Sequence, residues 1–223
     1  GVLLDGLMVL HTVAFALTES RRRQPADDLM TALVQAEVEG NRLTDEEIAA
    51  FFVLLCVAGN DTTRQTTSHT MLALQRNPGQ RAALMADFDG GIETAVEEFV
   101  RWSSPVLSFR RTARRDTEIR GQRITEGEKV VLFYLSGNRD PAVFAEPHTF
   151  DISRKPNPHV GFGGGGPHFC LGSHLARMQL RAIFDELLHR LPDIEVGEPE
   201  YLAGNFINGI KRLPCRFTPI TTS

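Results

Sequence analysis

The stretch that most constrains this chain is GFGGGGPHFCLGSHLARMQL, residues 161–180, where a glycine-rich loop leads through one cysteine into an amphipathic helix. Glycine has no Cβ, so residues 163–166 can adopt positive φ and lie flat against a large group. Cys170 stands where the loop becomes the helix, and the N–H groups of a first helical turn stabilise a thiolate. A thiolate beside a glycine surface suits an axial ligand of haem iron.

The same glycines also satisfy the dinucleotide-binding pattern G-x-G-x-x-G, with Gly161, Gly163 and Gly166. That pattern should follow a strand and open a helix directly. Here the segment Lys-Pro-Asn-Pro, residues 155–158, precedes the glycines, and residues 167–171 separate them from the helix. A nucleotide site is therefore a weaker interpretation than a haem site.

A zinc site is a second alternative, with His168, Cys170 and His174 as ligands. Structural zinc needs a fourth ligand and usually a second pair of ligands, which the neighbouring sequence does not supply. The simplest alternative is a glycine-rich loop beside a buried structural cysteine.

Composition narrows the class of protein. The chain has 223 residues, a net charge of −4 and three cysteines, Cys56, Cys170 and Cys215. An odd number of widely spaced cysteines favours a reduced, cytoplasmic chain over a disulfide framework. The mild acidity gives no basic face for nucleic acid. The apolar opening segment carries Asp5 and His11, is short for a membrane span and does not resemble a signal peptide.

Periodicity predicts helices over residues 1–18 and, starting after Asp27 and Asp28, up to Gly40. The segment Thr44 to Glu47 is a capping box, T-x-x-E, and predicts the start of a third helix. No firm breaker follows until Asn77-Pro78, so this helix should have about 32 residues. Residues 48–58 are almost all apolar and are expected to be buried on every side.

The segment AGNDTT, residues 58–63, interrupts the apolar part of that helix. The Thr62 hydroxyl can bond to the carbonyl of Ala58, four residues back, which opens the helix locally and admits water. With Asp61 beside it, the opening would suit proton delivery. The alternative is a tolerated kink next to a solvated acid.

The rest of the chain predicts short helices over residues 78–87 and 92–104, strands over 106–111, 117–120 and 129–134, and an irregular segment over 138–158. A last helix follows over residues 175–189, and loops with short strands follow it. Glu98 and Arg101 lie three residues apart on one helical face. Such a pair is ordinarily solvated, whereas a second arginine would make it a structural clamp.

Together these segments resemble the C-terminal half of a cytochrome P450, a haem-thiolate monooxygenase. The matching segments, in the family's order, are AGNDTT, EEFVR, NRDPAVFAEPHTFDISR and GFGGGGPHFCLG, and the ending FINGIKRLP resembles a substrate-contacting turn. The resemblance implies a mainly α fold with small β-sheets. Residues 1–223 would form the haem-binding portion, without the family's N-terminal half, and the chain does not begin with Met.

Carried over by position, the resemblance implies haem b as the cofactor, with Cys170 as the ligand of its iron. Asp61 and Thr62 resemble the acid–alcohol pair that relays protons, and Glu98 and Arg101, with Arg154, resemble the structural clamp. The remaining cofactor-binding positions are Arg111 and His168 at the haem propionates, with Phe162, Gly163, Gly172 and Ala58. Substrate-facing candidates are Leu55, Ala58, Val106, Leu107 and Ile207.

One departure refines the resemblance: Phe162 lies eight residues before Cys170, whereas the usual loop has seven. This longer loop is similar to that of mycobacterial and actinobacterial enzymes that hydroxylate terminal methyl groups of sterols and methyl-branched lipids. A ferredoxin and its reductase would supply electrons, and Arg177 or Arg181 could contact an acidic ferredoxin, although plain solvation explains these arginines equally simply. The alternative is an inactive structural fragment.

Overall fold

A computed structural model describes residues 1–219 of the chain, except for the side chains of Val2 and Leu3. It is mainly helical with five small two-stranded antiparallel sheets among the described residues, which confirms the expected fold class. The chain divides into two compact units, Gly1–Asp61 and Thr62–Ser223.

The first unit contains α1 (Val2–Arg23), α2 (Leu29–Gln35), the hairpin β1 (Glu37–Val38) and β2 (Asn41–Arg42), and the first part of α3 (Asp45–Arg76). Helix α1 runs past the predicted end at residue 18, because its basic last turn suits the negative end of the helix dipole. Asp28 caps α2 by accepting the Thr31 N–H at 2.8 Å. The prediction that this helix reaches Gly40 is wrong, since Glu39 and Gly40 form the positive-φ turn of the hairpin.

Helix α3 has the predicted length of 32 residues. Its capping box forms as expected: the Glu47 carboxylate accepts the Thr44 N–H at 2.8 Å, and the Thr44 hydroxyl accepts the Glu47 N–H at 3.2 Å. The prediction that residues 48–58 are buried on every side is wrong. Only Ile48 and Ala49 are buried there, because Ile48 packs on α2 at Met30 and Val34. The helix surface further along is open: Leu54 is 58% exposed and Val57 is 54% exposed.

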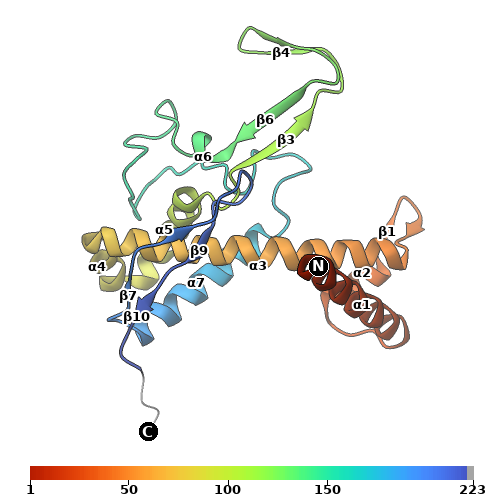
Figure 1. Cartoon of the computed structure of the whole chain (residues 1–223), viewed down its shortest axis with the longest axis horizontal. Helices are drawn as coiled ribbons and strands as arrows, with labels where there is room; N and C mark the ends of the chain where they lie inside the picture. Colours follow the sequence, from red (N-terminus) through yellow and green to blue (C-terminus); the bar gives the residue numbers. More distant parts are fainter. Residues whose placement is uncertain (220–223) are drawn as a thin grey trace. The chain divides into compact units, whose positions relative to one another are not determined.

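The second unit has its core between the end of α3, α4 (Pro78–Ala86), α5 (Phe88–Ser103) and α7 (Ser173–Arg190) (Figure 1). Phe99 of α5 and Phe184 of α7 are fully buried, with ring centroids 4.7 Å apart. Helix α5 starts four residues before its predicted start at 92, because the Asp87 side chain accepts the Gly90 N–H at 3.1 Å and caps it.

The strands of the second unit form short antiparallel pairs. The longest pair joins β3 (Ser108–Thr112) to β6 (Lys129–Phe133), and it continues into the β4 (Thr117–Ile119) and β5 (Gln122–Ile124) hairpin at its end (Figure 1). The other pairs are β7 (Glu195–Val196) with β10 (Cys215–Arg216) and β8 (Glu200–Tyr201) with β9 (Ile210–Arg212). The short helix α6 (Tyr134–Gly137) follows β6 directly.

Between α6 and α7 the chain has neither helix nor strand. This irregular segment contains the predicted meander and the cysteine loop. Within residues 1–219, none of the helices combines the length and the apolar character that crossing a membrane requires.

The packing of Phe184 predicts the cost of disturbing the core. Replacing a fully buried phenylalanine by alanine removes its contacts and leaves a cavity, so Phe184→Ala should lower the free energy of unfolding by about 3–5 kcal/mol. Phe217 is the control, since it is 44% exposed and Phe217→Ala should have little effect. Chemical denaturation of the two variants measures the difference, and equal losses would contradict the assignment of Phe184 to the core.

Candidate functional site

The centre of the second unit holds a buried cluster of charged side chains. Glu98 and Arg101 are both 0% exposed and Arg154 is 9% exposed. Arg101 donates to both Glu98 carboxylate oxygens at 2.7 Å, and Arg154 Nε donates to one of them at 3.3 Å. The structure therefore brings the three residues together, and the pair is buried rather than solvated.

The two arginines also bind the meander. The remaining N–H groups of Arg101 donate to the carbonyls of Asn138, Pro147 and Thr149. Those of Arg154 donate to the carbonyls of Ala145, Glu146 and Thr149. An ion pair that removes charge from water is stable only when its other donors and acceptors are satisfied. Here the backbone of the meander satisfies them, so the same bonds hold the meander in place.

Asn138 connects this cluster to the cysteine loop. Its side chain is fully buried, and its Nδ2 donates to the Ser104 hydroxyl at 2.8 Å. Its Oδ1 accepts the Val160 N–H at 2.7 Å, immediately before the glycine run. The start of the cysteine loop is thus fixed by a side chain from the start of the meander.

The cysteine loop is closed by its own backbone. The Gly163 N–H donates to the Val160 carbonyl at 2.8 Å, and the Cys170 N–H donates to the Phe162 carbonyl at 2.9 Å. Gly163, Gly165 and Gly166 have φ between +76° and +97°, which other residues rarely adopt. Helix α7 begins at Ser173, with Gly172 as its N-cap, so it starts two residues before the predicted start at 175 and Cys170 lies just ahead of the N-cap. Hydrogen bonds from helix N–H groups to the Cys170 sulfur stay a prediction.

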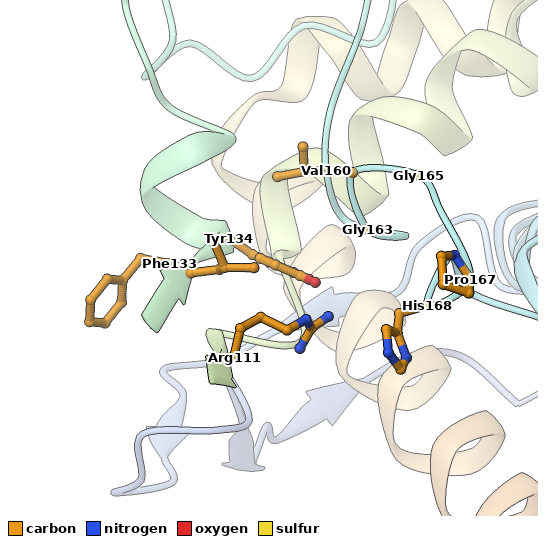
Figure 2. Close-up of a pocket in the computed structure, with 10 residues that line it drawn as sticks. Arg111, Phe133, Tyr134, Val160, Gly163, Gly165, Pro167 and His168 are labelled. Atoms are coloured by element: carbon orange, nitrogen blue, oxygen red, sulfur yellow. The ribbon is translucent and has the colours of Figure 1, made fainter. Parts of the chain in front are cut away.

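A cavity of about 380 Å³ opens on the glycine side of this loop. Arg111 of β3 and His168 of the loop both line it, and their side chains point toward a common space together with the Tyr134 hydroxyl (Figure 2). Two potential cations and a hydroxyl donor on one side of a cavity suit the carboxylates of an anionic ligand. Tyr134 was missed in the sequence, because a tyrosine at the end of a strand carries no distinguishing pattern.

Gly164 provides a test of whether a flat group fits this loop. Its φ is not positive, and no heavy atom of the described chain lies within 4 Å of where its Cβ would be. Nothing else in the described chain therefore requires glycine at this position. The open space beside Gly164 leaves room for a planar group such as a haem against the loop, and Cys170, which could supply a thiolate ligand, lies on the same loop.

The two alternative sites do not match this geometry. The glycine run lies in a loop that neither follows a strand nor opens a helix, which excludes the dinucleotide pattern. Among the described residues, no three His, Cys, Asp or Glu side chains gather closely enough to hold a metal ion. His168, Cys170 and His174 therefore do not form a zinc site in this structure.

The substrate-facing candidates of the second unit lie side by side. Val106 and Ile207 form an antiparallel bridge, and the Leu107 N–H donates to the Phe206 carbonyl at 2.7 Å. All three predicted residues, Val106, Leu107 and Ile207, are half-buried. The chain ending FINGIKRLP thus returns to the segment that follows α5.

The other candidates lie on α3, which is helical without interruption through AGNDTT. Leu55, Ala58 and Asp61 belong to the first unit, and Thr62 begins the second. The Thr62–Ala58 hydrogen bond expected from the sequence stays a prediction. The neighbouring Thr63 hydroxyl donates to Gln179 of α7 at 3.5 Å, so its side chain is directed to α7.

The sequence reasoning also missed a cluster behind the loop, formed by Glu97, His159 and Arg177. Glu97 accepts hydrogen bonds from both other side chains. Burial would raise the pKa of Glu97, but the bonds from His159 and Arg177 and the charge of Arg177 lower that pKa to about 2. Arg181 pairs with Glu93 and Asp89. Both arginines proposed as ferredoxin contacts therefore form ion pairs within the chain. Arg181 does so at the surface, whereas Arg177 is part-buried against Glu97 and is not simply solvated.

Comparison with known protein families shows to which family the chain belongs. The family model for cytochrome P450 matches residues 6–192. The chain belongs to the cytochrome P450 family. The segments AGNDTT, EEFVR, NRDPAVFAEPHTFDISR and GFGGGGPHFCLG lie within the matched range, whereas the ending FINGIKRLP lies after it.

Individual P450 relatives are similar over nearly the whole chain. A methyl-branched lipid omega-hydroxylase of Mycobacterium tuberculosis is 55% identical over 90% of this chain and 47% of the relative. A steroid C26-monooxygenase of Mycolicibacterium smegmatis is 43% identical over 94% of this chain and 48% of the relative. A solved Mycobacterium marinum cytochrome P450 in complex with pseudoionone is 62% identical, with a TM-score of 0.93 over 97% of this chain and 52% of that chain.

The chain thus spans about half the length of the curated P450 relatives it matches. These relatives are named as monooxygenases or hydroxylases, and the solved structure has the same fold. The matched half contains the cysteine loop, the buried ion pair and the long helix α3.

The buried carboxylate predicts a sharp difference between two glutamates of α5. Glu98→Ala leaves two arginines buried without their partner and should cost about 3–5 kcal/mol of unfolding free energy. Glu93→Ala is the matched control on the same helix, because Glu93 is exposed and pairs only with Arg181 at the surface. The yield of folded, haem-loaded protein and its denaturation midpoint measure both. A Glu98→Ala protein as stable as the parent would show that the pair has no structural role.

Proposed function

We propose that this chain forms the haem-binding part of a haem-thiolate monooxygenase that inserts one oxygen atom from O2 into a C–H bond of a hydrophobic substrate. The observation that carries the proposal is the Cys170 loop, with its glycine surface and the adjacent cavity that presents Arg111 and His168. Membership of the cytochrome P450 family supports the same chemistry.

Several residues of the loop, together with Arg111 of β3, would hold haem b. The Cys170 thiolate would be the protein ligand of the iron, and Gly163, with Phe162 and Gly172 at the loop ends, would shape the surface beside it. Arg111 and His168 would pair with the propionates. Thiolate-ligated haem, when bound, supplies oxygen activation, because the electron-rich sulfur favours O–O cleavage.

The role proposed for α3 is proton delivery. Thr62 would hold a proton at its hydroxyl and pass it toward the haem, and Asp61 would exchange that proton with water. A carboxylate beside an alcohol can move protons in single steps, since one accepts what the other donates. Ala58 and the clamp of Glu98, Arg101 and Arg154 would shape and stabilise the surroundings without taking part in the reaction.

The substrate class follows from the apolar candidates and from the relatives. Leu55, Val106, Leu107 and Ile207 offer only apolar side chains, which suit a hydrocarbon substrate. The named relatives act on methyl-branched lipids and on steroids. We propose terminal-methyl hydroxylation of a sterol or branched lipid, with electrons from a ferredoxin and its reductase. The location in the cytoplasm stays a prediction.

The first test concerns the iron ligand. Reduced and exposed to carbon monoxide, the haem-loaded protein should show the red-shifted Soret band of thiolate-ligated haem. Cys170→Ser should abolish this band, because serine supplies no thiolate. Cys56→Ser and Cys215→Ser are the controls and should retain it. A parent protein without the band would instead favour an inactive structural fragment.

The second test separates proton delivery from binding. Thr62→Ala should retain haem and substrate but lose hydroxylation by 10²–10⁴-fold, roughly the contribution of a positioned proton donor. Reducing equivalents would still be consumed and would emerge as peroxide or water. Thr63→Ala is the matched control, since the Thr63 hydroxyl bonds to Gln179. The measurement is alcohol formed per reducing equivalent with a terminal-methyl lipid. Equal values for Thr62→Ala and the parent would exclude the relay.

A further inference from the structure

Four side chains form a packed cluster behind the cysteine loop, on the surface of α5 and α7. They are Glu97, His159, Phe162 and Arg177, and only Phe162 has a part in the function proposed above. The cluster joins α5, the segment that precedes the loop, the loop itself and α7.

Glu97 is the acceptor at its centre. Its carboxylate accepts from Arg177 Nε at 2.5 Å and Nη2 at 3.0 Å, so the guanidinium binds both oxygens. It also accepts from His159 Nε2 at 2.9 Å. The His159 side chain is only 3% exposed and that of Glu97 is 27% exposed. Two-point binding of a planar guanidinium fixes its orientation as well as its distance.

Arg177 in turn holds the Phe162 ring. Its guanidinium carbon lies 4.4 Å from the ring centroid, a close cation–π contact. The His159 ring lies 5.7 Å from the same ring. Phe162 is therefore contacted by two side chains that Glu97 holds.

The loop backbone depends directly on these contacts. The Phe162 carbonyl accepts the Cys170 N–H at 2.9 Å, so the position of Phe162 determines that of Cys170. The Gly161 N–H donates to His159 Nδ1 at 3.1 Å, which leaves the proton of that ring on Nε2, facing Glu97. A Cβ on Gly161 would lie 2.5 Å from a Val100 methyl group, so the loop is pressed against α5 at this point.

We propose that Arg177, oriented by Glu97, is a positioning residue that holds the Cys170 sulfur in place as an iron ligand by clamping the Phe162 ring. The proposal rests on the haem-thiolate function. In this proposal the shape of the guanidinium matters in addition to its charge, because the group is flat and binds Glu97 at two points.

Replacing Arg177 by lysine distinguishes the effect of the shape of the guanidinium from the effect of its charge. Arg177→Lys keeps the positive charge near the thiolate, but a single ammonium cannot bind both Glu97 oxygens and also cover the Phe162 ring. A loop that is held less firmly would lose its thiolate ligand faster. The loss of one charge-assisted contact corresponds to a change of about tenfold in such a rate.

The experiment uses the haem-loaded protein, reduced and bound to carbon monoxide. The rate at which the red-shifted Soret band decays should rise about tenfold in Arg177→Lys. Arg181→Lys is the matched control, because Arg181 lies one turn further along α7 and forms only surface ion pairs with Glu93 and Asp89. Its decay rate should equal that of the parent. The thermal midpoint by circular dichroism should change little in either variant, which separates loop positioning from general unfolding.

Glu97→Gln is the second variant, and it decides the result if Arg177→Lys fails to load haem. Glutamine keeps the size of the side chain but removes the charge that orients the guanidinium, so the band should again decay faster than in the parent. Decay at the parent rate in the loaded variants would overturn the positioning role. A parent protein without any red-shifted band would refute the haem-thiolate function itself, which is a different outcome.

Discussion

The Glu98 carboxylate is the interaction on which the second unit depends. It is fully buried and accepts hydrogen bonds from Arg101, Arg154, the Asn157 side chain and the Asp151 N–H. A buried carboxylate with fewer partners would be strongly unfavourable, because it has lost its water. The partners come from α5 and from residues 151–157, so a satisfied charge and a folded meander require each other. An irregular segment acquires a defined path in this way without helix or strand bonds.

Helix α5 also contacts the cysteine loop, through Glu97, the residue next to Glu98. Glu97 and Glu98 are adjacent on α5 and therefore point in directions about 100° apart. Glu98 faces the meander, and Glu97 faces Arg177 of α7 and His159 at the entrance of the loop. Asn138 adds a third connection, because it contacts both Arg101 and Val160. One helix thus aligns the meander and the cysteine loop, which meet at residues 159–160.

The sequence predicted the parts of this structure that local chemistry determines. The capping box at Thr44, the length of α3 and the strand predicted over residues 117–120 follow from neighbouring residues, and they formed as expected. The burial of residues 48–58 was predicted wrongly. An apolar helix surface shows that a segment can pack against another one, but it does not show whether another segment covers it. The start of α5 was missed because Gly90 and Gly91 resemble a break, although Asp87 caps the helix there. His159 and Glu97 are 62 positions apart, so no local pattern could connect them.

Gly164 has a consequence for how variation in this loop is interpreted. The described chain places no heavy atom within 4 Å of the point where a side chain would begin, so the empty polypeptide tolerates an added methyl group there. If variants at residue 164 were compared by their folding yield without cofactor, substitutions at this position would therefore have little effect. The requirement for glycine would become visible only in the loaded state. On the function proposed above, a side chain added at residue 164 would therefore change cofactor loading and leave the stability of the polypeptide unchanged.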